Sequence, residues 1–195
     1  MVKSAPAEEE TRARARTRRA ILEAAVEVLA ESPSAPLSEV ARTAGVARST
    51  LQRYFAERAD LVRALGEYAE ELINEATKRA RTTEGTGLEA FRRLIPEYFG
   101  LQRVVMLAFG GEETWEEDAE WGPADLALRS LVERGHADGS IDPEVTPGWA
   151  RQILWAGLYA AWTYVNVEGT SAYEALNLCV RSLVKAVAAE GRGRA

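Results

Sequence analysis

Apolar residues recur at spacings of three and four along most of the chain, and this period constrains the fold more than any other feature. Ile21, Ala25 and Val28 begin the pattern near the N-terminus, and Cys179 and Leu183 continue it near the C-terminus. An amphipathic helix has this period, whereas a half-buried strand alternates every second residue. The 195 residues, 47% of them hydrophobic, suffice to bury a core, so the sequence predicts an all-α protein.

The period also predicts where the helices lie. The segment 1–10 is acidic, contains proline and has little to bury, so we expect a disordered tail there. Beyond it we expect a helix up to the SPSAP stretch at 32–36, two short helices, a long helix at about 57–81, and helices at about 88–99, 101–109, 123–137, 147–167 and 172–189.

The two short helices lie in LSEVARTAGVARSTLQRYF, residues 37–55. Gly45 follows the first of them, where a left-handed helix end favours glycine. Leu51 and Phe55 have the spacing to anchor the second helix from behind. This is the layout of a helix-turn-helix, whose second helix enters the major groove of DNA. An ordinary corner between two helices is the alternative, and the short turn alone does not exclude it.

The second short helix would turn Arg48, Ser49, Gln52 and Arg53 outward. Arginine pairs with guanine and glutamine with adenine through two hydrogen bonds each, so this face has the chemistry to read bases. Tyr54 and Arg58 flank it and suit phosphate oxygens. The candidate DNA-binding residues are Arg48, Ser49, Thr50, Gln52, Arg53, Tyr54 and Arg58.

Charge is distributed unevenly along a chain whose net charge is -6. Residues 12–64 hold ten arginines against six acidic residues, whereas residues 67–195 hold 13 basic and 21 acidic residues. A basic head on an acidic body points to a polyanionic partner for the head, although the arginines could also simply coat helices. The run TRARARTRR at 11–19 has two interpretations that stay open: an arm that contacts DNA, or a solvated helix stripe.

The string RRAILEAAVEVLAESPSAPLSEVARTAGVARSTLQRYFAERADLVRAL, residues 18–65, resembles the N-terminal domain of the tetracycline-repressor (TetR) family of bacterial transcriptional regulators. The resemblance implies a three-helix helix-turn-helix DNA-binding domain, expected at 11–60, and a C-terminal helical ligand-binding and dimerisation domain, expected at 61–195. It also implies a homodimer that binds a double-stranded DNA operator, with a palindromic sequence, and answers to a small-molecule effector, most simply as a repressor.

The chain departs from the family pattern at three positions. Gln52 stands where members usually have a tyrosine that contacts the phosphate backbone, and Arg58 stands where they usually have lysine. No serine or threonine occupies the position of Pro36, so we expect Ser34 or Ala35 to begin the helix, with Pro36 in its first turn.

The acidic body offers aromatic side chains for an effector. The candidate ligand-binding residues are Tyr98, Phe99, Met106, Trp155 and Tyr159, chosen by their position in the resembled fold. Aromatic residues at helical spacing can equally belong to an ordinary hydrophobic core. The segment EETWEEDAEW at 112–121 places two tryptophans among six acidic residues, which suits either a cationic ligand or a solvated loop.

The last two expected helices have apolar bands too wide for helices that are covered on one side only. A four-helix interface across a two-fold axis would bury both bands, with Leu183 and Val187 facing their symmetry mates. The sequence therefore predicts a homodimer with its seam at these residues.

Other functional classes find no support in the sequence. HADGS at 136–140 contains His, Asp and Ser, but neighbours within one turn cannot form a catalytic relay, and we expect no enzyme activity, cofactor or metal. The lone Cys179 fits a cytoplasmic protein, and the longest apolar run, 153–165, is too short to span a membrane. The alternative function is a helical small-molecule-binding or scaffold protein without sequence-specific DNA binding.

Overall fold

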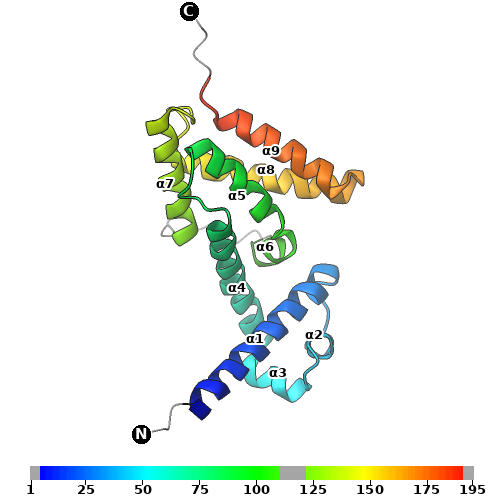
Figure 1. Cartoon of the computed structure of the whole chain (residues 1–195). Coiled ribbons are helices and arrows are strands. Elements are labelled where there is room, and N and C mark those ends of the chain that lie inside the picture. Colours follow the sequence, from blue (N-terminus) through cyan, green and yellow to red (C-terminus); the bar gives the residue numbers. More distant parts are fainter. Residues whose placement is uncertain (1–4, 110–121, 191–195) are drawn as a thin grey trace, which may run out of the picture. The chain divides into compact units, whose positions relative to one another are not determined.

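A computed structural model of the protein describes residues 5–109 and 122–190, with side chains from residue 10 onward (Figure 1). Every regular element within these ranges is a helix, apart from one isolated antiparallel bridge between Ile141 and Ala188. The helices are α1 (Ala5–Glu31), α2 (Leu37–Thr43), α3 (Arg48–Tyr54), α4 (Arg58–Arg79), α5 (Gly87–Phe99), α6 (Gln102–Phe109), α7 (Pro123–Asp138), α8 (Pro147–Glu168) and α9 (Ala172–Val187). The all-α fold predicted from the apolar period is confirmed.

Two helix starts differ from the sequence prediction. Helix α1 begins at Ala5, so the described part of the segment 1–10 is helical rather than disordered, and residues 1–4 lie outside the described residues. Helix α2 begins at Leu37, with Pro36 as its N-cap. The backbone of Pro36 is extended, with φ -71° and ψ 150°, so it precedes the helix instead of lying in its first turn.

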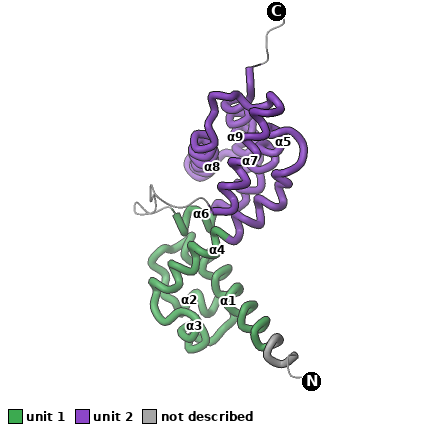
Figure 2. The backbone as a smooth tube through the Cα atoms, turned by 90° about the vertical axis from the view of Figure 1, so that its left-hand side faces the viewer, with its two compact units in different colours: residues 1–70, 103–115 green, residues 71–102, 116–195 purple. Residues whose placement is uncertain are grey.

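The chain forms two compact units (Figure 2). Unit 1 comprises residues 1–70 and 103–115, and unit 2 comprises residues 71–102 and 116–195. Unit 1 extends past the boundary expected at residue 60 because the first part of α4 packs into it. Leu61 and Leu65 are buried, and the hydroxyl of Tyr68 lies 3.5 Å from a carboxylate oxygen of Glu23 on α1.

Unit 1 is built around the buried stripe of α1. Its buried residues from the first three helices are Ile21, Leu22, Ala24, Ala25, Val28, Leu29, Val40, Ala41 and Leu51. The period of three and four in the sequence gives α1 this single apolar face; α2 packs on α1, and α3 packs on α2. Neither short helix is long enough to be stable alone, so both depend on these contacts.

Unit 2 depends on glycines at two helix crossings. A Cβ atom at Gly87 would lie 2.4 Å from the Cα of Gly135, so only glycine lets α5 approach α7 so closely. A Cβ atom at Gly157 on α8 would lie 2.7 Å from a methyl carbon of Leu183 on α9. The side chain of Leu183 therefore fills the space that Gly157 leaves open, within one chain.

The packing of α9 contradicts the predicted dimer seam. Leu183 is 5% exposed and Val187 0% exposed in the single chain, so neither is available to a symmetry mate. The prediction that these two residues face the partner is wrong, because the apolar band of α9 packs on α8 and α5 of the same chain. Apolar period alone does not say which neighbour covers a helix face.

The residues that the structure describes include no helix both long enough and apolar enough to cross a membrane. The apolar run 153–165 lies within α8, where Leu154, Leu158 and Trp162 are buried in unit 2.

Candidate nucleic-acid interface and effector site

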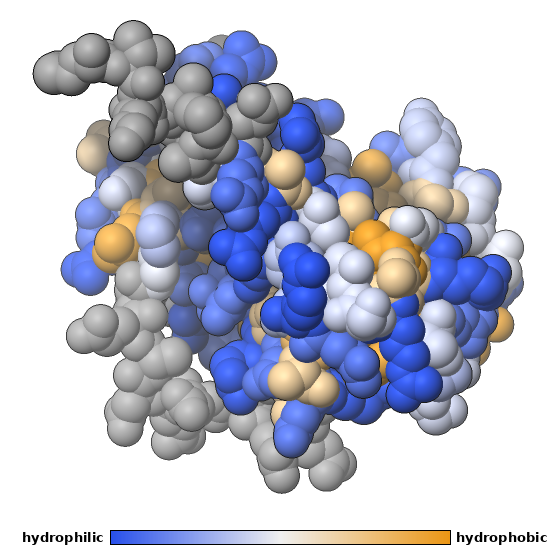
Figure 3. All heavy atoms as spheres, turned by 90° about the horizontal axis from the view of Figure 1, so that it is seen from below, coloured by the Kyte–Doolittle hydropathy of each residue, from blue (hydrophilic) through white to orange (hydrophobic). Residues whose placement is uncertain are grey.

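Helix α3 separates its side chains as the sequence predicted. Leu51 is fully buried, whereas Arg48, Ser49, Gln52 and Arg53 are exposed. Thr50 and Tyr54 are half-buried at the edges of this face. Among the residues that the structure describes, the guanidinium groups of Arg48 and Arg53 have no hydrogen-bond or ion-pair partner, and α3 contains no acidic residue. Figure 3, seen from the side on which α3 lies in Figure 1, shows mostly hydrophilic side chains with small hydrophobic patches.

The turn before α3 requires glycine. Gly45 has φ 68°, in the left-handed region, and its amide donates to the carbonyl of Arg42 at 3.1 Å. The amide of Val46 then donates to the carbonyl of Ala41 at 3.0 Å. These two bonds end α2 and fix the direction in which the chain enters α3.

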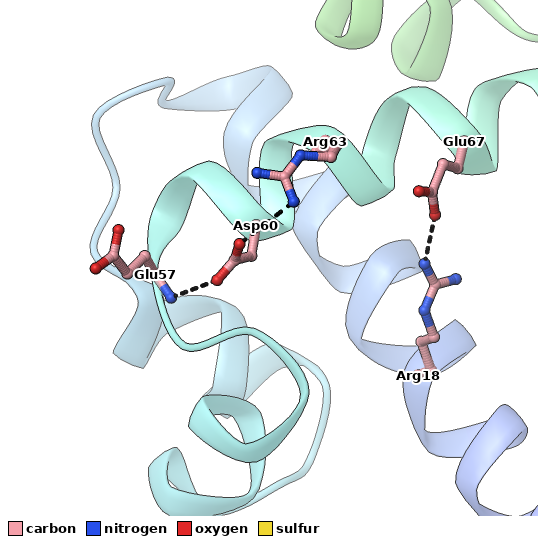
Figure 4. A network of polar contacts seen from close by, with 5 residues as sticks. All are labelled: Arg18, Glu57, Asp60, Arg63 and Glu67. Carbon is pink, nitrogen blue, oxygen red and sulfur yellow. Dashed lines mark hydrogen bonds and ion pairs between the residues drawn. The ribbon is translucent and has the colours of Figure 1, made fainter.

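Arg18 holds the end of α3 from behind. Its guanidinium carbon lies 5.9 Å from the ring centroid of Phe55, the buried residue that caps the C-terminus of α3. The same guanidinium donates to Glu67 on α4 at 2.9 Å (Figure 4). One arginine from α1 therefore contacts both the end of α3 and the side of α4.

The start of α4 is fixed by a carboxylate. Asp60 accepts a hydrogen bond from the backbone amide of Glu57 at 3.1 Å, and its other oxygen lies 3.6 Å from Arg63 (Figure 4). A carboxylate near the first turn satisfies an amide that the helix leaves unpaired.

Arg58, the first residue of α4, turns toward the connection between α1 and α2. Its guanidinium donates to the carbonyl oxygen of Ala35 at 2.8 Å and also to that of Pro33. The side chain thus serves the fold of unit 1 at a position where the sequence predicted a phosphate contact.

The arginine run 11–19 lies on α1. Arg18 pairs with Glu67, and Arg19 donates to Glu23 at 3.0 Å, so part of the run is engaged within unit 1. Arg14 and Arg16 are exposed. A contact between this run and DNA stays a prediction.

In unit 2, Tyr98 joins three helices. Its ring stacks on Trp155 of α8, with centroids 5.3 Å apart and planes inclined by 20°. Its hydroxyl lies 2.7 Å from the hydroxyl of Thr77 on α4, in the buried interior. Burial raises the pKa of Tyr98 to about 12. The neutral phenol is therefore the form present at physiological pH.

The other effector candidates differ in their surroundings. The indole of Trp162 donates to the carbonyl of Phe99 at 3.0 Å, which holds α8 to the end of α5. Tyr159 is 56% exposed, and Met106 is 37% exposed and belongs to unit 1. The acidic segment 112–121, proposed from the sequence as a cation site or a solvated loop, lies outside the described residues.

The acidic residue Asp125 affects the pKa of Tyr98. The charge of Asp125 on α7 also raises the pKa of Tyr98, after the larger effect of burial. A carboxylate oxygen of Asp125 lies 3.7 Å from the guanidinium of Arg151 on α8. The residues that the structure describes contain no cluster of metal-ligating side chains.

Comparison with known proteins decides the family. Residues 21–65 match the profile of the bacterial regulatory proteins of the tetR family, which covers the helix-turn-helix. The chain is 35% identical over 178 residues to the HTH-type transcriptional repressor LfrR of Mycolicibacterium smegmatis, covering 91% of this chain and 94% of that protein. This chain belongs to the TetR family.

Two further relatives extend the comparison. The HTH-type transcriptional regulator NfxB of Pseudomonas aeruginosa is 28% identical over 131 residues, which cover 65% of this chain and 70% of NfxB. The crystal structure of LfrR in complex with proflavine superposes with a TM-score of 0.72 at 36% identity, covering 88% of this chain and 96% of that one. The TetR family consists of DNA-binding transcriptional regulators rather than enzymes, and the function predicted from the helix-turn-helix is confirmed at that level.

The HADGS segment has a structural role in this TetR-family chain. Asp138 accepts a hydrogen bond from the amide of Gly87 at 2.9 Å, and the hydroxyl of Ser140 accepts one from the amide of Leu88 at 3.1 Å. These side chains satisfy the first amides of α5 from the end of α7. Hydrogen bonding from Ser140 is the main reason why the pKa of Asp138 is lowered.

Sequence analysis missed Thr77, Asp125 and Arg151. Thr77 could have been found, since it is a polar residue one turn beyond Ile73 and beside Ala76 on the apolar stripe of α4. Asp125 and Arg151 carry no such signal, because charged residues at helix starts are common on any surface.

Proposed function

We propose that this TetR-family protein is a repressor that binds a palindromic DNA operator as a homodimer. We further propose that a planar aromatic molecule bound in unit 2 is its effector and causes release of the operator. The chain has no catalytic role in this proposal.

The exposed face of α3 is the observation that carries the proposal. Arg48, Gln52 and Arg53 point their donors away from unit 1, while Leu51 holds the helix from behind. Exposed guanidinium and amide groups on one short helix suit guanine and adenine edges in the major groove. Ser49 is proposed to lie on this base-reading face, with Thr50 and Tyr54 as phosphate contacts at its edges.

The proposed dimer surface lies on the exposed faces of α8 and α9. Six large hydrophobic or aromatic side chains of these helices are exposed: Trp149, Tyr159, Tyr164, Val167, Tyr173 and Leu178. Val167 is 73% and Tyr173 75% exposed, whereas single chains rarely leave such residues together in water. A two-fold axis through this surface would pair α8 and α9 with their copies, and it replaces the seam through Leu183 and Val187.

The proposed effector class rests on the stacked pair Tyr98 and Trp155 and on the charge of Asp125, which acts on Tyr98 and is also paired with Arg151. Aromatic faces favour flat, positively charged molecules by stacking and by cation–π contact, and a negative charge that acts on them adds to this preference. The relative LfrR was crystallised with proflavine, which is such a molecule. Tyr159, which is largely exposed, is assigned to the dimer surface instead, and Phe99 and Met106 stay predictions.

Selection of bound duplexes from a random DNA pool tests the DNA part of the proposal. We expect enrichment of a palindrome with half-sites spaced by about one helical turn or a multiple of it. Binding that is indifferent to sequence and falls steeply with salt would refute it, and would favour a helical protein without specific DNA recognition. Titration of proflavine into the protein and into its complex with the enriched duplex then tests binding and release separately.

A further inference from the structure

The connection between α1 and α2 does not satisfy its own carbonyl groups. Its sequence, SPSAP at 32–36, includes two prolines, which have no backbone N–H. The amide of Ser32 donates to Val28, and that of Ala35 donates to Ser32 at 2.9 Å. Pro36, the N-cap of α2, makes no side-chain capping bond. The carbonyls of Pro33 and Ala35 therefore depend on donors from elsewhere in unit 1.

Arg58 supplies those donors. One terminal nitrogen of its guanidinium lies 2.8 Å from the carbonyl oxygen of Ala35, and the other donates to the carbonyl of Pro33. Both bonds come from a charged donor, and such bonds are stronger than neutral ones. The planar guanidinium presents two parallel donors in a fixed fork, an arrangement that the single nitrogen of lysine does not reproduce.

The arrangement differs from that of the arginines on α3. Arg48 and Arg53 are exposed, and neither has a partner among the described residues, whereas Arg58 is half-buried with both terminal nitrogens engaged. Ala35 is itself buried, so the connection is held by packing and by the fork together.

We infer that Arg58 is a positioning residue: it fixes the α1–α2 connection to the start of α4, and so sets the placement of α2 and α3 for base reading. Helix α2 has seven residues and no cap of its own at its start, so its position is set by such contacts. Its end passes directly into the turn at Gly45 and then into α3. This inference rests on the proposed reading of DNA by α3.

Arg58→Lys separates positioning from a phosphate contact, because lysine keeps the charge and binds phosphate but loses the fork. The probes are the duplex enriched from the random pool and a duplex of the same composition in scrambled order. We expect R58K to lose roughly tenfold in preference for the enriched duplex, with Arg58→Ala losing at least as much, since one charged hydrogen bond is of that size. Affinity for the scrambled duplex and its salt dependence should stay at the wild-type level in R58K. Arg63→Lys changes an exposed arginine five residues further along α4; it is the matched control and should change neither.

Hydrogen exchange gives a second readout that needs no DNA. In R58K, amide protection should fall in 37–54, which covers α2 and α3, and stay unchanged in the 15–31 part of α1. Wild-type affinity and preference in R58K would overturn the inference. The inference would also be overturned if R58A lost affinity equally for both duplexes and its salt slope fell by about 1, because that result is typical of a phosphate contact. Unchanged hydrogen exchange of residues 37–54 in R58K would also overturn the inference. This exchange test needs no DNA, so it remains valid if the wild-type protein enriches no duplex, a result that would refute only the proposed function.

Discussion

Replacing Tyr98 with phenylalanine should destabilise unit 2 less than replacing Thr77 with valine, and the hydrogen bonds give the reason. The hydroxyl oxygen of Thr77 lies 2.7 Å from the carbonyl of Ile73 and 2.7 Å from the hydroxyl of Tyr98. A carbonyl only accepts, so the single proton of Thr77 goes to Ile73. Tyr98 must therefore donate to Thr77, which leaves the two residues with different losses on mutation.

The expected magnitudes follow from what each change leaves unpaired. Tyr98→Phe removes one hydrogen bond but leaves Thr77 bonded to Ile73, at a cost of about 1 kcal/mol. Thr77→Val leaves the hydroxyl of Tyr98 in the interior without its acceptor, which costs about 1 to 3 kcal/mol for that group alone. Thr77→Ser keeps the hydroxyl and is the matched control.

The same tyrosine predicts a pH dependence. Burial raises the pKa of Tyr98 from 10.0 to about 12, so between these values the unfolded chain loses the phenol proton and the folded chain keeps it. The contribution of the neutral Tyr98 phenol to the free energy of unfolding is fully present below pH 10. It is lost as the pH rises toward 12, and two pKa units correspond to about 2 to 3 kcal/mol. Tyr98→Phe should lack this part of the loss.

Urea unfolding of the wild type and the three variants, followed by circular dichroism at pH 7 and between pH 9 and 12, measures both effects. A Tyr98→Phe protein that is destabilised as much as Thr77→Val at pH 7 would refute the assigned direction of the hydrogen bond. An alkaline loss of stability equal in wild type and Tyr98→Phe would refute the raised pKa as its cause.

Three further outcomes are expected. Leu183→Asp should unfold the protein, because a charge packed against Gly157 costs about 3 to 5 kcal/mol, and a folded Leu183→Asp protein would refute the packing. Leu178→Asp, on the proposed dimer surface, should instead fold and sediment as a monomer. Arg48→Ala should cost about 1 to 3 kcal/mol on the enriched duplex and relax preference at one base pair per half-site, and uniform weakening on all duplexes would instead indicate a phosphate contact. The pKa of Asp138 lies below its ordinary value of 3.8, so the contribution of this carboxylate to stability is present above pH 3.8 and is lost as the pH falls further. Thermal melts of Asp138→Asn should therefore show less destabilisation by acid than those of the wild type.

Local features of the sequence were sufficient for much of this protein. The helical period located the helices, and the turn at Gly45 with Leu51 six residues later identified the helix-turn-helix and its exposed face. These features depend on neighbours within a turn or two, where spacing alone decides which side chains share a face. The family followed from the same stretch.

Only the tertiary structure decided which partner each side chain meets. The period of α9 marked Leu183 as buried, but whether its own α8 or a second chain covers it depends on Gly157 in another helix. Arg58 meets carbonyls 23 and 25 residues away in sequence, where its charge alone suggested DNA. Such contacts join segments whose separation along the chain carries no period, because packing of whole helices, rather than local geometry, brings them together.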